Sequence, residues 1–263
     1  MRLIFLGDVV GDTGRVALAR ALPELRRDYA PDAVIVNGEN AAGGRGITPK
    51  LCEELFRCGV DVITLGDHAW DQRELIVWLD SPAADRVLRP HNHQPGTPGR
   101  GSCLLDTPAG RLGVLCLCGR TFMRPGLDNP FTTGYEEALR LREAGAEAIL
   151  TDMHGEASSE KVAMGWRLDG VVSAVIGTHT HVPTADSRIL PGGTAFQCDA
   201  GMCGSLNGVI GREREAVLQG CITALPCKYP VAGFPAQVCG CLVDTEGLRA
   251  TAIRRLFLCY DCA

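Results

Sequence analysis

Eight residues of this chain combine carboxylate, amide and imidazole groups in an order that suits metal-ion chemistry. They are Asp8, Glu39, Asn40, Asp67, His68, His154, His179 and His181. Carboxylates and imidazoles together suit manganese, iron or zinc, and two divalent ions held about 3.5–4 Å apart need a bridging ligand. Four of the 6 histidines fall in this set, so little is left for a second histidine site. The other two, His91 and His93, lie in a Pro-rich loop without a visible partner.

Taken one at a time, these motifs have ordinary structural explanations. A glycine and an aspartate after a strand, as at Gly7-Asp8, more often form a turn than a metal site. A lone His154 would more often be a buried histidine with a hydrogen-bond partner. The stretch 177–181 is a stronger signal, because an apolar strand that ends in two imidazoles suits a paired metal site. The interpretation therefore depends on the whole set.

The candidate residues share one position, just after short apolar runs that predict buried strands. These runs are 3–6, 33–36, 62–65, 148–151 and 171–176. In α/β folds the carboxyl ends of strands form the crevices in which ligands bind. Five strand ends that carry Asp, Glu, Asn or His are more than scattered polar loops would give, so we expect the eight side chains to meet at one edge.

The segments between these runs predict the helices and the remaining strands. Helices are expected over 16–25, from Thr48-Pro49 to Gly59, and over 74–79, 135–144 and 159–168. Asp71 with Glu74 resembles a capping box for the third of these helices. A hairpin is expected from 102–105 and 112–117, and two final strands from 238–243 and 248–258.

Composition excludes several classes of protein. The 263 residues carry no visible linker or composition shift, which predicts a single domain over 1–263. A net charge of -5 argues against binding to long nucleic acid, which needs a basic face. The negative net charge does not exclude a small phosphorylated substrate, since bound metal cations can make the electrostatic potential at the site positive. No signal peptide or membrane span is visible, so we expect a cytoplasmic protein. The number of chains that assemble, a homo-oligomer included, is left open.

The cysteines carry little functional information. Their number, 13, is odd, and no Cys-x-x-Cys occurs. Cys116-x-Cys118 and Cys239-x-Cys241 sit in apolar runs, where alternate residues share a strand face. We interpret them as small buried apolar residues in a reducing compartment. The competing hypothesis, a cysteine-based zinc or redox protein, predicts that thiol alkylation removes the metal.

As a set, the motifs resemble a known family. The order Asp, Asn-Gly-Glu-Asn, Gly-Asp-His, His and Gly-Thr-His-Thr-His resembles the calcineurin-like metallophosphoesterases, and among them the YmdB-like cyclic-nucleotide phosphodiesterases. The similarity runs over nearly the whole chain. Further similar stretches without obvious metal ligands are 7–11, 119–122, 128–131, 159–161, 165–166, 184–186 and 188–190.

The resemblance implies a fold, a site and a reaction. The fold would be a four-layer αββα sandwich of two mixed β-sheets. Asp8, Glu39, Asn40 and His181 would hold one divalent metal, and Glu39 would bridge to a second one, completed by Asp67, His154 and His179. Fe or Mn is expected, with Zn as a third option. A metal-bound hydroxide would attack a small phosphodiester in line, with His68 as the general acid outside the metals. The substrate would be a 2′,3′- or 3′,5′-cyclic nucleotide.

One residue departs from the family pattern, which usually has Asn where this chain has Asp67. An ionised aspartate cannot donate a hydrogen bond to a phosphate, and it makes the site one unit more negative. We therefore expect tighter metal retention and weaker attraction for an anionic substrate. Asp67 also suggests an alternative hypothesis from another functional class: the chain is a catalytically weak dimetal regulatory or binding protein on the same scaffold.

Overall fold

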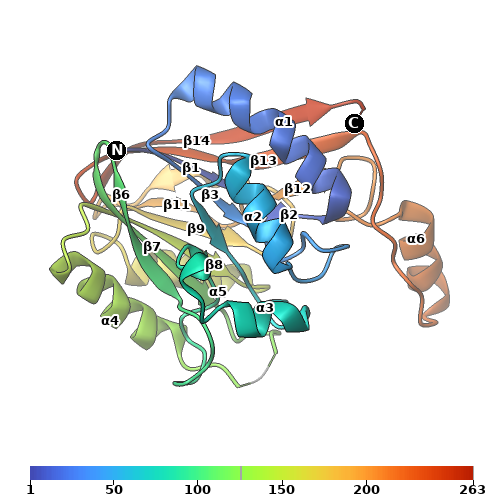
Figure 1. The fold of residues 1–263 in the computed structure, drawn as a ribbon, viewed down its shortest axis with the longest axis horizontal. Helices are drawn as coiled ribbons and strands as arrows, with labels where there is room; N and C mark the ends of the chain where they lie inside the picture. Colours follow the sequence, from blue (N-terminus) through green and yellow to red (C-terminus); the bar gives the residue numbers. More distant parts are fainter. Residues whose placement is uncertain (125, 263) are drawn as a thin grey trace.

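The computed structural model describes residues 1–124 and 126–262, and within that part the first sheet has eight strands (Figure 1). They are β1 (Arg2–Leu6), β2 (Asp8–Val9), β3 (Ala33–Asn37), β4 (Val62–Thr64), β5 (Val87–Leu88), β12 (Met202–Ser205), β13 (Ala236–Glu246) and β14 (Arg249–Tyr260). Their order is β2-β12-β13-β1-β3-β4-β5, and β14 also pairs with β13. The run β1-β3-β4-β5 is parallel, whereas β13 is antiparallel to β1. This sheet is therefore mixed.

The second sheet is also mixed. Among the described residues it has six strands, β6 (Ser102–Thr107), β7 (Gly110–Cys118), β8 (Ala148–His154), β9 (Ala174–Thr178), β10 (Arg188–Ile189) and β11 (Ala195–Gln197). Their order is β10-β11-β9-β8-β7-β6. The central strands β7, β8, β9 and β11 are parallel, and the two outer pairings are antiparallel. The predicted hairpin is the β6–β7 pair.

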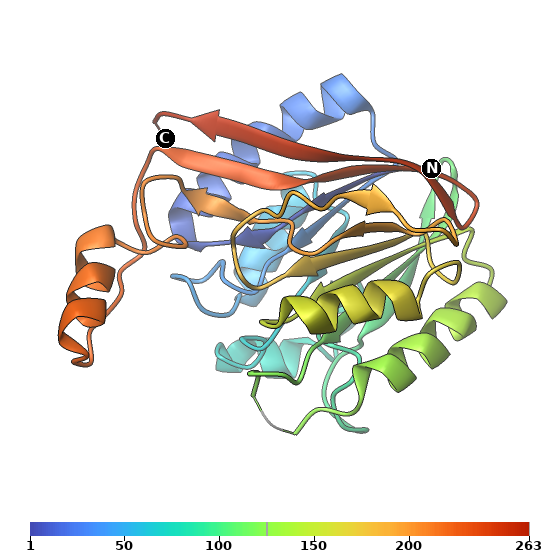
Figure 2. The ribbon, with the colours of Figure 1, turned by 180° about the vertical axis from the view of Figure 1, so that it is seen from behind.

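The two sheets pack face to face between two layers of helices (Figures 1 and 2). The helices on the first sheet include α1 (Gly11–Tyr29) and α2 (Pro49–Arg57), and those on the second are α4 (Pro130–Glu143) and α5 (Ser158–Arg167). Alternation along β1 explains the layering, because successive side chains point to opposite faces. Ile4 joins the core under α1 and α2, whereas Phe5 joins the core between the sheets. A third core lies between the second sheet and α4 and α5. The predicted four-layer fold is confirmed.

This topology brings the predicted strand ends to one edge. In the first sheet β1, β3 and β4 are parallel neighbours, and in the second sheet β8 and β9 are parallel neighbours. The loops after these five strands carry the candidate residues, apart from Asp8, which begins β2 just after β1, and His154, which is the last residue of β8. Side chains from two different sheets therefore meet.

Asp71 does not cap a helix, which corrects the capping-box prediction. Helix α3 (Arg73–Trp78) begins two residues later, after Gln72, and has no side-chain cap. The Asp71 carboxylate instead lies 2.9 Å from Nδ1 of His68. The Asp71 carboxylate thus contacts the imidazole three residues earlier in the chain and does not cap the first turn of α3.

The structure also differs from the sequence predictions in the bounds of the first helix and in several elements that were not predicted. Helix α1 begins at Gly11 rather than Val16 and runs to Tyr29, because its first turn packs on the β12 region, with Gly14 against the Cys203 backbone. Strands β5, β10, β11 and β12 and the short 3₁₀ turn η1 (Pro82–Ala84) were not predicted; each has four residues or fewer. Helix α6 (Arg214–Thr223) was not predicted either, and it projects away from the sheets (Figures 1 and 2). No helix in the described ranges has the length and apolar character that crossing a membrane requires.

Candidate metal centre

Four of the predicted residues form a compact group. Glu39, Asp67, His154 and His179 each offer an atom that lies within 4.8 Å of the others, in the arrangement that a metal ion needs. His154 Nε2 is 3.1 Å from Glu39 Oε1 and 3.2 Å from Asp67 Oδ1. His179 Nδ1 is 3.0 Å from His154 Nε2 and 3.4 Å from Asp67 Oδ1. Two oxygen and two nitrogen donors therefore converge on one place.

A second group adjoins the first through Glu39. The Nδ2 atom of Asn40 is 3.3 Å from Glu39 Oε1 and 3.3 Å from His181 Nε2. His181 Nε2 is 3.7 Å from Asp8 Oδ1. A cation here would take the amide oxygen of Asn40, which turning the amide over would present. Glu39 is thus in contact with residues of both groups.

Local backbone geometry makes this convergence feasible. A side chain on Gly66 would collide with the Glu39 carboxylate and the His154 ring, so only glycine lets the chain before Asp67 approach them. His179 and His181 have φ values of 99° and 67°. Such values are costly for residues with a Cβ and gather at functional sites. The strained backbone turns both imidazoles toward the carboxylates.

A buried network below the group fixes the tautomer of His154. Thr178 Oγ1 donates to Asp152 Oδ1 at 2.7 Å and lies 2.9 Å from His154 Nδ1. The Thr178 hydroxyl has one proton, which it donates to Asp152. It can therefore only accept a hydrogen bond from His154, so Nδ1 of His154 must carry a proton. Without a cation, Nε2 can donate to the carboxylates of Glu39 and Asp67. Because the other proton stays on Nδ1, it is Nε2 whose lone pair would bind a cation, as in a histidine metal ligand. Burial raises the pKa of Asp152 to about 6.

A buried ion pair holds the loop that carries the two histidines. Lys161 Nζ lies 2.9 Å from Asp199 Oδ2, and both side chains are almost fully buried. The same Asp199 oxygen accepts from the backbone N–H and the hydroxyl of Thr180, which stands between His179 and His181. Lys161 also donates to the Thr178 carbonyl. Asp199 was not predicted, since its sequence neighbourhood gives no signal.

The electrostatics of the group favour a bound cation. Asp8 and Glu39 are fully buried, and Asp67 lies beside them. Burial opposes charge on His154, but the carboxylates of Glu39 and Asp67 raise the pKa of its imidazole well above the usual value. Asp8 Oδ1 is buried without a hydrogen-bond partner among the described residues. Buried carboxylates need compensating positive charge, so the donor set fits divalent ions.

His68 lies beside the group rather than in it. Its backbone N–H donates to Glu39 Oε2 at 3.3 Å, while its Nδ1 faces Asp71. Arg124 adds a positive charge, with Nη2 3.3 Å from His68 Nδ1 and Nε 3.7 Å from Asp67 Oδ2. Neither Asp71 nor Arg124 was predicted as a site residue. Glu156 was missed too, although its carboxylate is 3.2 Å from His179 Nε2.

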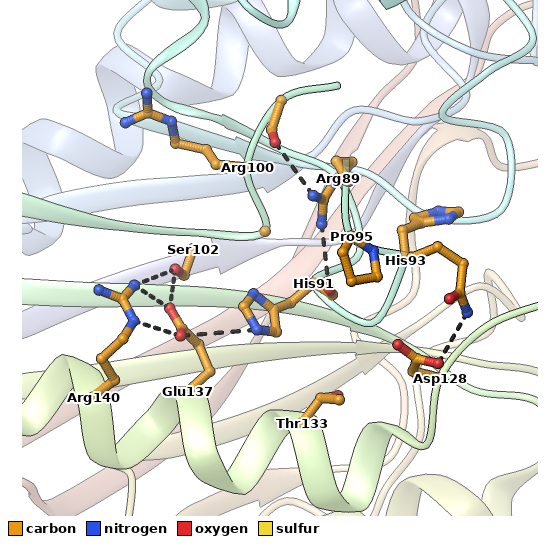
Figure 3. Close-up of a pocket in the computed structure, with 13 residues that line it drawn as sticks. Arg89, His91, His93, Pro95, Arg100, Ser102, Asp128, Thr133, Glu137 and Arg140 are labelled. Atoms are coloured by element: carbon orange, nitrogen blue, oxygen red, sulfur yellow. Dashed lines mark hydrogen bonds and ion pairs between the residues drawn. The ribbon is translucent and has the colours of Figure 1, made fainter. Parts of the chain in front are cut away.

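Two cavities have histidines in their walls, and the smaller one is lined by residues of the metal-competent group. One of about 390 Å³ opens over the group, lined by His68, His179 and His181 and by Arg45, Arg212 and Tyr229. A larger cavity of about 560 Å³ lies under the Pro-rich loop and is lined by His91, His93, Glu137 and Arg140 (Figure 3).

The Pro-rich loop has more internal contacts than the sequence indicated. His91 has a partner, since its Nε2 lies 3.8 Å from Glu137 Oε2. Arg89 donates to five backbone carbonyls of the loop and thereby fixes its path.

The cysteines of the two Cys-x-Cys stretches are buried as expected, whereas Cys58, Cys221, Cys259 and Cys262 are exposed. Cys116, Cys118, Cys239 and Cys241 are buried free thiols. Burial raises the pKa of Cys241 to about 12. Within the described ranges the metal-competent group contains no cysteine.

Comparisons with known proteins identify a family and several similar proteins. The model of the YmdB-like protein family matches residues 4–256. A 2′,3′-cyclic-nucleotide 2′-phosphodiesterase of Bacillus subtilis strain 168 is 41% identical over 254 residues, covering 97% of this chain and 95% of the relative. A crystal structure of a hypothetical protein from Thermus thermophilus is 40% identical with a TM-score of 0.91 and covers 98% and 99% of the two chains. A Mycoplasma pneumoniae structure described as a novel phosphatase is 32% identical with a TM-score of 0.91, covering 100% and 94%.

Proposed function

Because this chain belongs to the YmdB-like protein family, we propose that it is a dinuclear-metal phosphodiesterase acting on small phosphodiesters. Asp8, Glu39, Asn40 and His181 would hold one cation, and Glu39, Asp67, His154 and His179 the other. The substrate is a 2′,3′-cyclic nucleotide, in keeping with the name of the Bacillus relative. A 3′,5′-cyclic nucleotide is the second candidate substrate.

The observation that carries this proposal is the shared position of Glu39. Its carboxylate is in contact with His154 of the first group and Asn40 of the second. A carboxylate between two donor sets is the bridging ligand that a pair of cations requires. The unpartnered Asp8 oxygen and the Nε2 lone pair of His154 supply further donors of the right kind.

The side chains around the cations provide the rest of the chemistry. When bound, the two cations supply a nucleophilic water near neutral pH and stabilise charge on the phosphoryl oxygens. His68, as the imidazolium with a proton on each ring nitrogen, would then donate its Nε2 proton to the leaving oxygen. Asp71 accepts from Nδ1 of His68 at 2.9 Å, which keeps Nε2 available for that transfer. Arg124 offers the substrate phosphate a positive charge on the same side.

Asp67 favours a second candidate function, a dimetal binding protein with weak turnover. With Asp8, Glu39, Asp67 and a hydroxide, four negative charges face the four positive charges of two divalent ions. Arg124, 3.7 Å from Asp67, restores part of the attraction for an anion. This arrangement supports the enzyme over the binding protein.

Hydrolysis of 2′,3′-cyclic AMP by the purified protein, with added Mn²⁺ or with EDTA, tests the proposal. Turnover that needs Mn²⁺ and stops with EDTA is the expected result. Two tightly bound metals without turnover on either 2′,3′- or 3′,5′-cyclic AMP would instead support the binding protein. Loss of metal on thiol alkylation would contradict both.

A further inference from the structure

A small cavity adjoins the metal centre on the side of Asp67. It has a volume of about 130 Å³ and is lined by Asp67, Arg124 and the apolar or aromatic side chains of Trp70, His93 and Leu127. The rings of Trp70 and His93 meet edge to face, with centroids 5.2 Å apart and planes inclined by 70°. An aromatic-walled space therefore begins at a residue of the metal-competent group.

Besides the charged Asp67 and Arg124, His93 is a polar residue of this cavity. In the part of the chain that the structure describes, neither ring nitrogen of His93 has a hydrogen-bond partner, whereas His91 faces Glu137. Burial lowers the pKa of His93 to about 4. A neutral imidazole has one donor and one acceptor, and both are available to a ligand. His93 also lines the larger cavity of Figure 3, so it stands between two spaces.

The size and lining of the cavity suit a flat heterocycle. At about 130 Å³ the cavity is slightly smaller than the apolar cavity of about 150 Å³ that is known to hold a benzene ring, so its size is close to that of a single aromatic ring. Ligand pockets are typically apolar and aromatic, with a few polar groups that fix orientation. The cavity over the metal group is different, because Arg45, Glu156 and Arg212 line it and Tyr229 is its aromatic residue. That space suits the charged phosphate better than a base.

We propose that the nucleobase of the substrate binds in the cavity between Trp70, His93 and Leu127, with His93 hydrogen-bonding to the base edge. This inference rests on the proposed function and adds the residues that recognise the substrate. Trp70 supplies an aromatic surface and Leu127 an apolar wall. Arg124, at the same cavity and within 3.3 Å of His68 Nδ1, joins the base subsite to the reacting phosphate.

The test compares two five-membered cyclic phosphodiesters, 2′,3′-cyclic AMP with a base and glycerol 1,2-cyclic phosphate without one. The measured quantity is the ratio of their kcat/KM values. His93→Ala and Trp70→Leu are each expected to lower this ratio about tenfold or more, because aromatic contacts with a base are worth that much. Activity on the base-free compound reports whether each variant is folded. Trp166→Leu, at a half-exposed tryptophan of α5, is the matched control and should leave the ratio unchanged.

Two results would overturn the proposal. One is a ratio that stays constant in both the His93 and Trp70 variants. The other is a ratio that falls only in Tyr229→Leu, which would place the base over the metal group instead. A wild-type protein that hydrolyses neither of the two compounds would contradict the proposed function. Calorimetric titration with adenosine then tests the cavity alone: binding weakened by His93→Ala supports the subsite, and no binding overturns it.

Discussion

The Asp71 carboxylate lies 2.9 Å from Nδ1 of His68, and this contact fixes which ring nitrogen can reach a substrate. Both side chains are largely buried, with 20% and 17% of their surfaces exposed. An imidazole held at Nδ1 by a carboxylate presents Nε2 outward. This contact supports the proposed role of His68 as a proton donor that is separate from the proposed metal ligands.

Removing the ring of His68 should cut turnover without releasing metal. His68→Ala is expected to lower kcat roughly 10²–10⁴-fold, the usual contribution of a general acid. Metal content, measured by mass spectrometry after gel filtration, should match the wild type. Loss of metal in this variant would place His68 among the ligands and contradict its role as proton donor.

Replacing Asp71 should have a milder effect of the same kind. Asp71→Asn keeps the ring of His68 and its proton but removes the charge that orients it, so kcat should fall by about tenfold. The pH–rate profile is the informative measurement, because the profile should shift if Asp71 acts through His68. A fall in kcat with an unchanged profile would indicate a merely structural role.

Changing Asp67 to the residue that the family usually carries tests the charge argument. Asp67→Asn is expected to preserve or raise kcat/KM, because the site becomes one unit more positive toward an anionic substrate. Metal retention during dialysis against a chelator should weaken in the same variant. Lower activity together with full metal retention would refute the hypothesis.

The buried Lys161–Asp199 pair should be needed for stability. Asp199→Ala leaves the Lys161 ammonium buried without its partner, which typically costs about 3–5 kcal/mol. Urea unfolding measures this loss, and Asp106→Ala, at the exposed partner of Arg111, is a matched control that should change little. Because Asp199 also accepts from Thr180, metal affinity should fall as well. A stable variant with unchanged metal affinity would contradict the role of the pair.

Metal removal should destabilise the whole chain. A ligand that binds only the folded state at 100 times its Kd adds roughly 2.7 kcal/mol to the free energy of unfolding. Calorimetric scans with EDTA and with added Mn²⁺ should therefore differ in Tm. Identical transitions would mean that no cation binds the folded protein.

The strand ends could be predicted because their signal is local. Buried runs such as 33–36 and 148–151 are followed within three residues by Glu39 and His154, and parallel strands align such ends. The contact of Asp71 with His68 could not be predicted, because spacing alone does not distinguish it from a helix cap. Arg124 and Asp199 could not be predicted either, since each reaches the site through contacts distant in sequence. The pairing of β13 with β1 is likewise non-local.

The candidate ligands are divided between the two sheets. Asp8, Glu39, Asn40 and Asp67 follow strands of the first sheet, whereas His154, His179 and His181 belong to the second. Neither sheet alone contains both kinds of donor, the carboxylates and the imidazoles. With the ligands we propose, a cation can be captured only after the sheets have docked. Metal uptake would then be the closing step of folding, and a chain with a misassembled sheet interface would remain metal-free.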